Sequence, residues 1–522
     1  MIRLIAQRSR HSWVGALLFF VWLALVVAQA LQHVMWRDEV RALSIALSGD
    51  GWLQMLQNLH GEGHPALWYL LLRAGHDISG RVEILEILSV AIAAAAAALL
   101  TWRAPFNLTV KALILFGFFL TYEYSVSARN YGLGMLLLFA VAACYRRRRE
   151  NGVVLGVLLF LLANTNLIAT ALSGAFLLFW LIDILTETGP RWTPALKTFF
   201  LNAVLASFGA GLCLFTVLPT YNDAAVALAA GPISPADLLQ AALLPAGGTL
   251  GALVRPIMQG EPGSFRTILL GSLVLFGGAF GLLRRTGALV AAVVSLAALA
   301  IFFQFGAHGD YRHAAQWLCL LIALYWIEAD RATQALPATQ EKPESLLARS
   351  GALLFLLLLA MQIVPSAGRV ESLLQGAPSP RPGREFGAFL AERPDLSDAI
   401  LIADPDYLLE ALPYYATNKA WLIRESRYGD VVRFTRDARL TLSLDDIRET
   451  AARLRRETGK PVLILLHEKL DDLTALGKIK EGYNWTLTLD GEQAARFRRD
   501  TTYLRRFAPD ASDESFDLFL AR

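Results

Sequence analysis

The chain has few cysteines and few charged residues. Only three of its 522 residues are cysteines. All three lie inside apolar runs, so the sequence indicates neither a disulfide framework nor a cysteine metal motif. Charged residues make up 18% of the chain, which is less than a soluble protein of this size usually carries. The net charge of +3 gives no support to a general role in nucleic-acid binding.

What the chain has instead is a series of apolar runs of about 20 residues, which predicts a polytopic α-helical membrane protein. About eleven transmembrane helices are expected in residues 1–368. They are placed near 12–34, 82–102, 106–122, 130–145, 152–163, 167–185, 198–218, 265–283, 286–305, 313–328 and 350–366. No small-residue cleavage site follows the first run, so it is interpreted as a retained helix rather than a signal peptide.

Basic residues predict the orientation of these helices, because Lys and Arg accumulate on the cytoplasmic side of a membrane. With the N-terminus in the cytoplasm, the inside segments hold sixteen Lys and Arg and the outside segments hold eight. The run RRRR at 146–149 and the pair at 284–285 are the strongest inside anchors. An odd number of spans then puts the C-terminus outside.

The end of the chain has the composition of a soluble domain. A Pro/Gly-containing linker is expected at 369–383, followed by a small α/β extracytoplasmic domain at 384–522 with a partly parallel sheet. Its predicted strands are 399–404, 461–466 and 517–522, and its clearest predicted helix is 443–459, with Ser443 as N-cap and Gly459 as C-terminal stop. A glycine-rich phosphate loop is absent from the sequence there, so nucleotide binding is not supported.

The orientation places several polar residues on one face of the membrane. Asp38 and Glu39 follow the first span and open an amphipathic first outside loop at 35–81. The other polar residues expected on this face are His60, Glu62, His64, Glu123, Arg129, Asn164, Asn166, His308, Asp310, Arg312 and His313. Charged side chains beside a membrane helix are costly to bury and are a functional-site hypothesis by default. The turns that carry them could converge on one cavity at the bilayer surface.

Each of these residues also has an ordinary structural explanation. Asp38 and Glu39 could be an interfacial pair satisfied by Arg37 and Arg41, which lie four residues apart on one helix face. The HGEGH segment could be a solvated turn, and the arginines could reach to lipid headgroups. The Trp and Tyr residues near these turns, including Trp36, could form only an aromatic belt.

Four segments in this set resemble the multi-spanning glycosyltransferases of the GT-C superfamily. This class includes the protein O-mannosyltransferases and the lipid A aminoarabinose transferase. The segments are RDEVRALSIA (37–46), GEGHPALWYLLLR (61–73), YEYSVSARNYGLGMLL (122–137) and GDYRHAAQW (309–317). The resemblance covers roughly residues 10–330. Family members usually have a second proline after the first, where this chain has Ala66, and this departure leaves the subfamily open.

The resemblance implies an inverting glycosyltransferase on the outer face of the membrane. Such an enzyme moves a sugar from a polyprenyl-phosphate donor to a lipid, glycan or protein acceptor. It implies Asp38 as the general base and Glu123 as a second acidic residue, and Arg129, Arg312, His64 and His313 as candidates to stabilise the departing phosphate. Glu39 and Tyr131 are expected to contact substrate. No cofactor is required, although Glu62 with His64 or His308 could bind a divalent metal, as some relatives do.

Two other functions compete with this one. A transporter or flippase of a lipid-linked glycan would share the phosphate-binding arginines. It should also show an internal repeat and polar residues deep within helices, and neither is clear in the sequence. The third possibility is an interaction protein whose soluble domain is the functional part. The absence of extramembrane cysteines suits a bacterial inner (plasma) membrane protein of the cell envelope.

Overall fold

A computed structural model describes residues 5, 12–148, 150, 152–218, 233–258, 263–334, 345–376, 381–470, 477–480, 484–507 and 513–522. Arg149 of the basic run, residues 377–380 of the expected linker and the basic residues before position 11 lie outside this described part.

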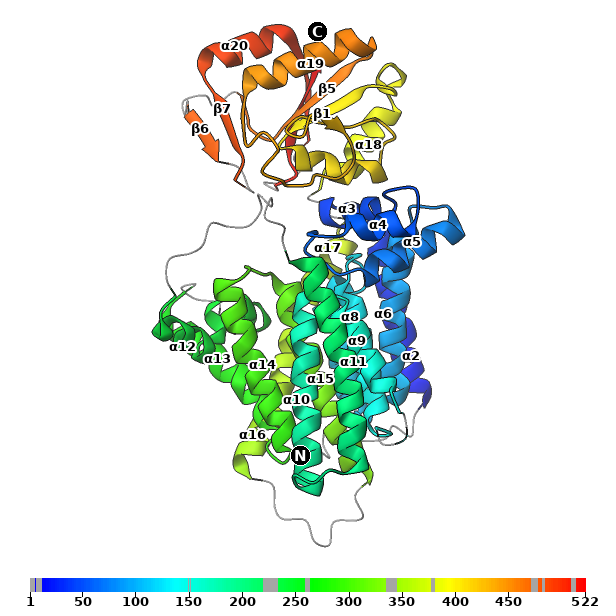
Figure 1. Cartoon of the computed structure of the whole chain (residues 1–522), viewed down its shortest axis with the longest axis vertical. Helices are drawn as coiled ribbons and strands as arrows, with labels where there is room; N and C mark the ends of the chain where they lie inside the picture. The colour runs from blue at the N-terminus through cyan, green and yellow to red at the C-terminus, as the bar shows by residue number, and fades with distance from the viewer. Residues whose placement is uncertain are drawn as a thin grey trace.

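The larger part of the molecule is a bundle of apolar helices (Figure 1). Six helical segments of the described residues are long and apolar enough to cross a membrane, so the chain is a polytopic helical membrane protein, as predicted. They are α2 (Ser12–Gln32), α6 (Ile84–Arg103), α10 (Leu167–Thr188), α11 (Pro194–Val217), α14 (Thr286–Phe305) and the consecutive α16 (Leu346–Met361) and α17 (Ile363–Leu374). Shorter apolar helices are α8 (Tyr131–Tyr145), α9 (Val154–Ala163) and α13 (Phe265–Phe280).

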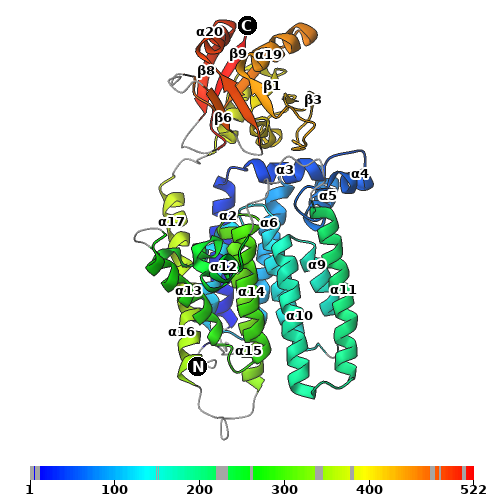
Figure 2. The same cartoon turned by 60° about the vertical axis from the view of Figure 1, so that its left-hand side comes forward.

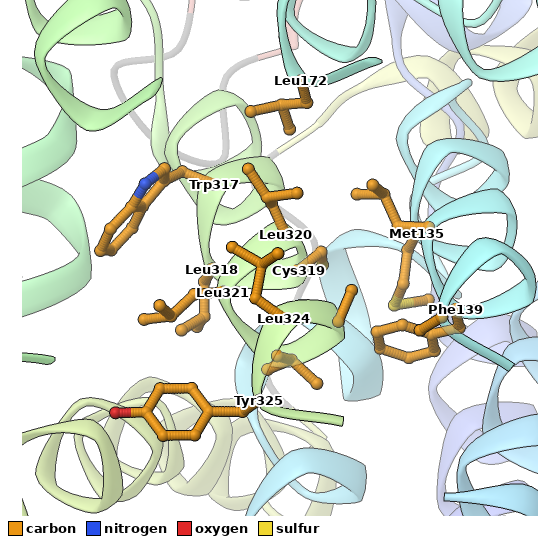
Figure 3. Packing of buried hydrophobic residues seen from close by; sticks show 14 of the residues in the cluster. Met135, Phe139, Leu172, Trp317, Leu318, Cys319, Leu320, Leu321, Leu324 and Tyr325 are labelled. Carbon is orange, nitrogen blue, oxygen red and sulfur yellow. The ribbon is translucent and has the colours of Figure 1, made fainter. Parts of the chain in front are cut away.

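Helix α15 (Tyr311–Gln334) lies at the centre of the bundle. Its residues from Ala314 to Ala329 are buried on every side, which is the pattern of a helix enclosed by other helices. Figure 3 shows Leu320 and Leu324 of this helix on the side of Met135 and Phe139 of α8, whereas Trp317 points away from them on the other side. The enclosed position of α15 holds its first turn, which carries Arg312, at a fixed place at one end of the bundle.

The segment expected as one helix near 106–122 is divided. It forms α7 (Leu108–Leu115) and then a π-helix, η1 (Phe119–Glu123), which ends at Glu123. Short π-helical turns occur frequently at functional sites. The expected linker is also shorter than predicted, because α17 remains helical to Leu374.

Three short helices lie at the end of the bundle that faces the C-terminal region: α3 (Arg37–Ala46), α4 (Trp52–Asn58) and α5 (Leu67–Ser79) (Figures 1 and 2). Their apolar faces share one hydrophobic cluster with the start of α6. The expected amphipathic loop is therefore a packed layer of helices. The remaining short elements of the bundle are α12 (Pro235–Leu243), η2 (Pro245–Gly247) and η3 (Thr249–Ile257).

The C-terminal region folds around a four-stranded sheet with the order β1-β5-β9-β8. Strands β1 (Ile400–Asp404) and β5 (Val462–Leu466) are parallel, whereas β9 (Phe516–Ala521) runs antiparallel to β5 and to β8 (Thr501–Phe507). Hydrophobic clusters cover both faces of this sheet. The other elements are α18 (Gly383–Ala391), η4 (Pro394–Leu396), η5 (Asp406–Tyr414), β2 (Trp421–Leu422), β3 (Arg427–Tyr428), β4 (Thr441–Ser443), α19 (Leu444–Thr458), β6 (Gly477–Lys480), β7 (Thr486–Leu489) and α20 (Gly491–Asp500).

Local sequence signals predicted much of this region. Helix α19 begins at the capping box of Ser443 and Asp446, and ends at Gly459 in the left-handed conformation (φ 68°). The three predicted strands correspond to β1, β5 and β9 to within a residue. The sequence did not predict β8 or the second sheet, β4-β7-β6.

Direct hydrogen bonds join the C-terminal region to the helical layer of α3–α5 and to the ends of α2 and α6. Arg384 donates to the carbonyl of His33 at 2.6 Å, and the Tyr415 hydroxyl donates to the carbonyl of Met35 at 3.0 Å. The Tyr414 hydroxyl donates to Glu86 at 3.0 Å. The C-terminal region thus holds the chain between α2 and α3 in place.

Candidate functional site

Glu39 is buried at the beginning of α3, where its carboxylate connects three parts of the chain. It accepts a hydrogen bond from the backbone N–H of Trp36 at 2.9 Å, which caps the helix. The backbone N–H of Ala128 donates to it at 2.6 Å, and Nε2 of His33 at the end of α2 lies 3.0 Å away. Glu39 therefore fixes α3 against α2 and against the turn that precedes α8.

The charge of Glu39 is stabilised by these donors. Burial alone would raise its pKa, but the neighbouring His33 and the hydrogen bond from Trp36 bring the pKa below its ordinary value. With a side chain that is 0% exposed, Glu39 is enclosed by protein groups. This enclosure is the signature of an anchor, and it does not fit the expected role of Glu39 as a residue that contacts substrate.

Asp38, the adjacent residue, is in a different environment. Its side chain is 30% exposed, and Nη1 of Arg129 lies 3.5 Å from its Oδ2 while donating to its backbone carbonyl at 2.6 Å. Burial would raise the pKa of Asp38, but Arg129, Arg37 and Arg312 together lower it. At 3.5 Å the side-chain contacts are long, so this ionised carboxylate still has acceptor capacity for a ligand.

His64 extends the site on the side of the first loop. Its Nε2 lies 3.0 Å from Nη2 of Arg129. Burial and the positive charge of Arg129 lower the pKa of His64 to about 3, so the ring is neutral at physiological pH. Because arginine can only donate, Nε2 accepts, and the ring proton is on Nδ1. That Nδ1 is buried and has no partner among the described residues, so its N–H is left to donate a hydrogen bond to a ligand.

Tyr131 and His313 form the opposite side of the site. The Tyr131 hydroxyl lies 2.8 Å from Nε2 of His313, whose Nδ1 accepts from the backbone N–H of Asp310 at 2.8 Å. The Asp310 contact requires the proton of a neutral His313 to be on Nε2, which then donates to Tyr131. The hydroxyl proton of Tyr131 is therefore directed away from His313.

Glu123 ends the π-helix at the same end of the bundle, and burial raises its pKa. The positive charges that act on it most strongly are those of Arg312, Arg369 and Arg381, which oppose this rise. Glu123 is thus a second carboxylate near Arg312, which also acts on Asp38. Glu123 takes up a proton at a higher pH than Asp38, because its pKa is raised whereas that of Asp38 is lowered.

The proposed metal ligands are not brought together. Glu62 makes a two-point ion pair with Arg41, at 2.9 and 2.6 Å, and His64 contacts Arg129. His308 does not join them: within the described ranges, no group of three or more His, Cys, Asp or Glu side chains has a metal-binding arrangement.

Arg41 is a residue whose role the sequence pattern did not indicate. The ordinary structural explanation paired it with Asp38 or Glu39, but it pairs with Glu62 and with Glu410 of η5, and donates to the carbonyl of Val432 at 2.8 Å. Arg41 therefore joins the first loop to the C-terminal region. Contacts between segments more than 360 residues apart have no local sequence signal.

Two hollows lie near these residues. A cavity of about 550 Å³ runs between α3 and the C-terminal region, lined by polar groups such as Ser44, Asn58, Arg427 and Asp430. The second is an open groove of about 580 Å³ between α2, α7 and α17. Its lining is mostly apolar: Leu25, Phe116, Ile363, Ser366, Ala367, Val370, Glu371, Leu374 and Gln375.

Comparisons with known proteins give structural neighbours only. No protein-family model matches the chain, and no curated protein matches it. Among solved structures, it is similar to ArnT from Cupriavidus metallidurans. The crystal structure bound to undecaprenyl phosphate matches over 98% of both chains, with 11% identity and a TM-score of 0.45. The apo structure matches over 97% of both chains, with 12% identity and a TM-score of 0.48.

At such identities and with TM-scores below 0.5, residue roles cannot be transferred. The roles proposed below rest on contacts within this chain.

Removing the charge of Glu39 should destabilise the protein. Glu39→Gln leaves two backbone N–H donors and His33 with a weaker acceptor, and about 1–3 kcal/mol is expected for a disturbed buried hydrogen-bonding group. Thermal unfolding in detergent should show a lower melting temperature than wild type at pH 7. Because the pKa of Glu39 is lowered in the fold, the difference should be full above pH 4.5 and shrink as the pH falls further.

Glu83→Gln is the matched control, because the Glu83 side chain is 43% exposed at the start of α6. It should leave the melting temperature close to that of wild type. Equal melting temperatures for wild type and Glu39→Gln at pH 7 would show that Glu39 is not an anchor.

Proposed function

We propose that the protein is a membrane glycosyltransferase that moves a sugar from a polyprenyl-phosphate donor to a hydroxyl-bearing acceptor. The observation that carries this proposal is the pair of adjacent carboxylates with opposite environments. Glu39 is buried and saturated by protein donors, whereas Asp38 is ionised, partly exposed and surrounded by arginines. A polar site of this kind at the end of an apolar helix bundle is suited to a substrate with a charged head and a lipid tail.

In this reaction Asp38 is the general base. It accepts the proton of the acceptor hydroxyl as that oxygen forms a bond to the anomeric carbon of the sugar. The bond between the anomeric carbon and the phosphate oxygen breaks, and its electron pair leaves with the polyprenyl phosphate. A single displacement of this kind inverts the anomeric centre. The low pKa of Asp38 keeps it ionised and ready to accept a proton at neutral pH.

The departing phosphate needs positive charge and hydrogen-bond donors. Arg129 and Arg312 supply charge, and the Nδ1–H of His64 and the hydroxyl of Tyr131 are donors. Glu123, whose pKa is raised, is placed to hold a proton close to the phosphate. Glu39 and His313 position these groups, and neither needs to touch the substrate.

The apolar groove between α2, α7 and α17 is the proposed path of the polyprenyl tail. Its lining is largely hydrocarbon, and it is open to the surface. Arg369 of α17 lies over the ring of Tyr122, with its guanidinium carbon 3.9 Å from the ring centre. Since Arg369 also acts on Glu123, a tail in this groove would bring the phosphate toward the arginines.

The orientation predicted from the basic residues belongs to the same proposal. The basic residues place the N-terminus in the cytoplasm. With about eleven spans, the site and the C-terminal domain then lie outside. The transfer then occurs on the outer face of a bacterial inner membrane. What supports this is the position of α3–α5 and of the C-terminal domain at one end of the bundle, opposite the loop between α10 and α11 (Figure 2).

Asp38→Asn should abolish transfer while leaving donor binding in place. An amide cannot accept the hydroxyl proton as a base, so the turnover rate should fall by roughly 100-fold or more. The measurement is transfer of labelled sugar from a polyprenyl-phosphate donor in membranes that contain the protein, with donor binding measured separately.

Asp50→Asn, which changes an exposed carboxylate in the same loop, should transfer at the wild-type rate. Wild-type transfer by Asp38→Asn would refute the role of Asp38 as base. If the wild-type protein moves the intact lipid-linked sugar across the bilayer and transfers no sugar, the transporter alternative is correct.

Cysteine labelling tests the orientation. Glu392→Cys, at an exposed position after α18, should react with a membrane-impermeant maleimide added outside intact spheroplasts. Pro190→Cys, exposed between α10 and α11, should react only after permeabilisation. Wild type is the background control, because Cys213 and Cys319 are buried and Cys144 is half-buried. The reverse labelling pattern would overturn the orientation.

A further inference from the structure

Trp36 has a fixed place two residues before the pair of carboxylates. It is the N-cap residue of α3, with an extended backbone (φ −109°, ψ 172°), and its N–H is held by Glu39. The anchoring that buries Glu39 therefore also sets the position from which the indole of Trp36 projects. The sequence pattern left this residue as one member of an aromatic belt, and the structure gives it different neighbours.

Three arginines surround the indole of Trp36. The guanidinium carbons of Arg312 and Arg381 each lie 4.7 Å from the centre of its ring, and that of Arg129 lies 5.9 Å away. These arginines come from three separate segments: the turn before α8, the first turn of α15, and the segment that leads into α18. Arg381 is therefore a contribution to the site from the segment that joins the bundle to the C-terminal region.

Bringing three guanidinium groups together is unfavourable because like charges repel each other, and burial strengthens the repulsion. An indole face offsets part of this cost, since its negative electrostatic potential attracts cations within about 6 Å of the ring centre. The carboxylate of Asp38 offsets another part through Arg129. A leucine or a lipid tail in place of the indole would supply no such attraction.

We propose that Trp36 is a positioning residue that gathers Arg129, Arg312 and Arg381 into one anion-binding site for the phosphate of the lipid donor. This proposal rests on the proposed function and deepens it in two respects. The indole holds the arginines beside one another in addition to the carboxylates that pair with two of them, Asp38 with Arg129 at 3.5 Å and Asp310 with Arg312 at 2.6 Å. The segment that joins the bundle to the C-terminal domain becomes part of the donor site through Arg381, which lies directly before α18.

Binding of a short polyprenyl phosphate tests this role. The probe is farnesyl phosphate, with uncharged farnesol as the comparison, and binding to the full-length protein in detergent is measured at several salt concentrations. Trp36→Leu keeps an apolar side chain but removes the aromatic face. It should weaken farnesyl phosphate binding at least tenfold, reduce the salt dependence of that binding, and leave farnesol binding unchanged.

Two further variants separate positioning from a general effect on folding. Trp36→Phe retains an aromatic face and should bind farnesyl phosphate within threefold of wild type. Arg381→Met leaves Trp36 intact, and should weaken farnesyl phosphate binding and its salt dependence while farnesol binding stays the same. Trp52→Leu is the control, because Trp52 is 43% exposed at the start of α4. It should bind like wild type.

The outcomes distinguish the role of Trp36 from the class of donor that the protein binds. If wild type prefers farnesyl phosphate to farnesol, and both Trp36→Leu and Arg381→Met retain wild-type affinity and salt dependence, the role of Trp36 is refuted while the donor class stands. If wild type shows no preference for farnesyl phosphate, the phosphate-lipid donor and the role of Trp36 are both overturned.

Discussion

The buried carboxylate of Glu39 is the constraint on which the rest of the site depends. A charge in that position is tolerated because Trp36, Ala128 and His33 provide hydrogen bonds from three segments of the chain. Satisfying Glu39 fixes the entry to α3, and with it the positions of Trp36 and Asp38, which both precede it. Asp38 can then remain partly exposed, since its carboxylate is not needed to hold the helix in place.

The site lies between the helix bundle and the C-terminal region, and contacts from both parts hold it in place. Arg41 connects the first loop to Glu410, and Arg384 binds the carbonyl at the end of α2. Through these contacts the C-terminal region closes over α3, and Arg381, in the segment directly before α18, lies over the indole of Trp36. A polar site beside a membrane benefits from such a cover, because excluding water strengthens every charge interaction inside it.

Sequence patterns predicted the parts of the molecule that depend on local signals. Apolar runs predicted the helical membrane class, and the capping residues Ser443 and Gly459 marked α19 to the residue. Polar groups at span ends are conspicuous, so the sequence also pointed to Asp38, His64 and Arg129, which lie in contact in the structure. The sequence could not indicate that Glu39 is buried whereas Asp38 is partly exposed, or that Arg41 pairs with Glu410. Those outcomes depend on contacts between distant segments, which leave no periodic or spaced pattern.

The most direct test of the account is a cryo-electron microscopy structure of the wild-type protein with farnesyl phosphate bound. The account predicts phosphate density in contact with Arg129 and Arg312 beside the face of Trp36, with the tail in the groove between α2, α7 and α17. It also predicts that Glu39 keeps its contacts with Trp36 and Ala128 unchanged. Phosphate bound away from these arginines, or a direct contact between Glu39 and the ligand, would contradict it.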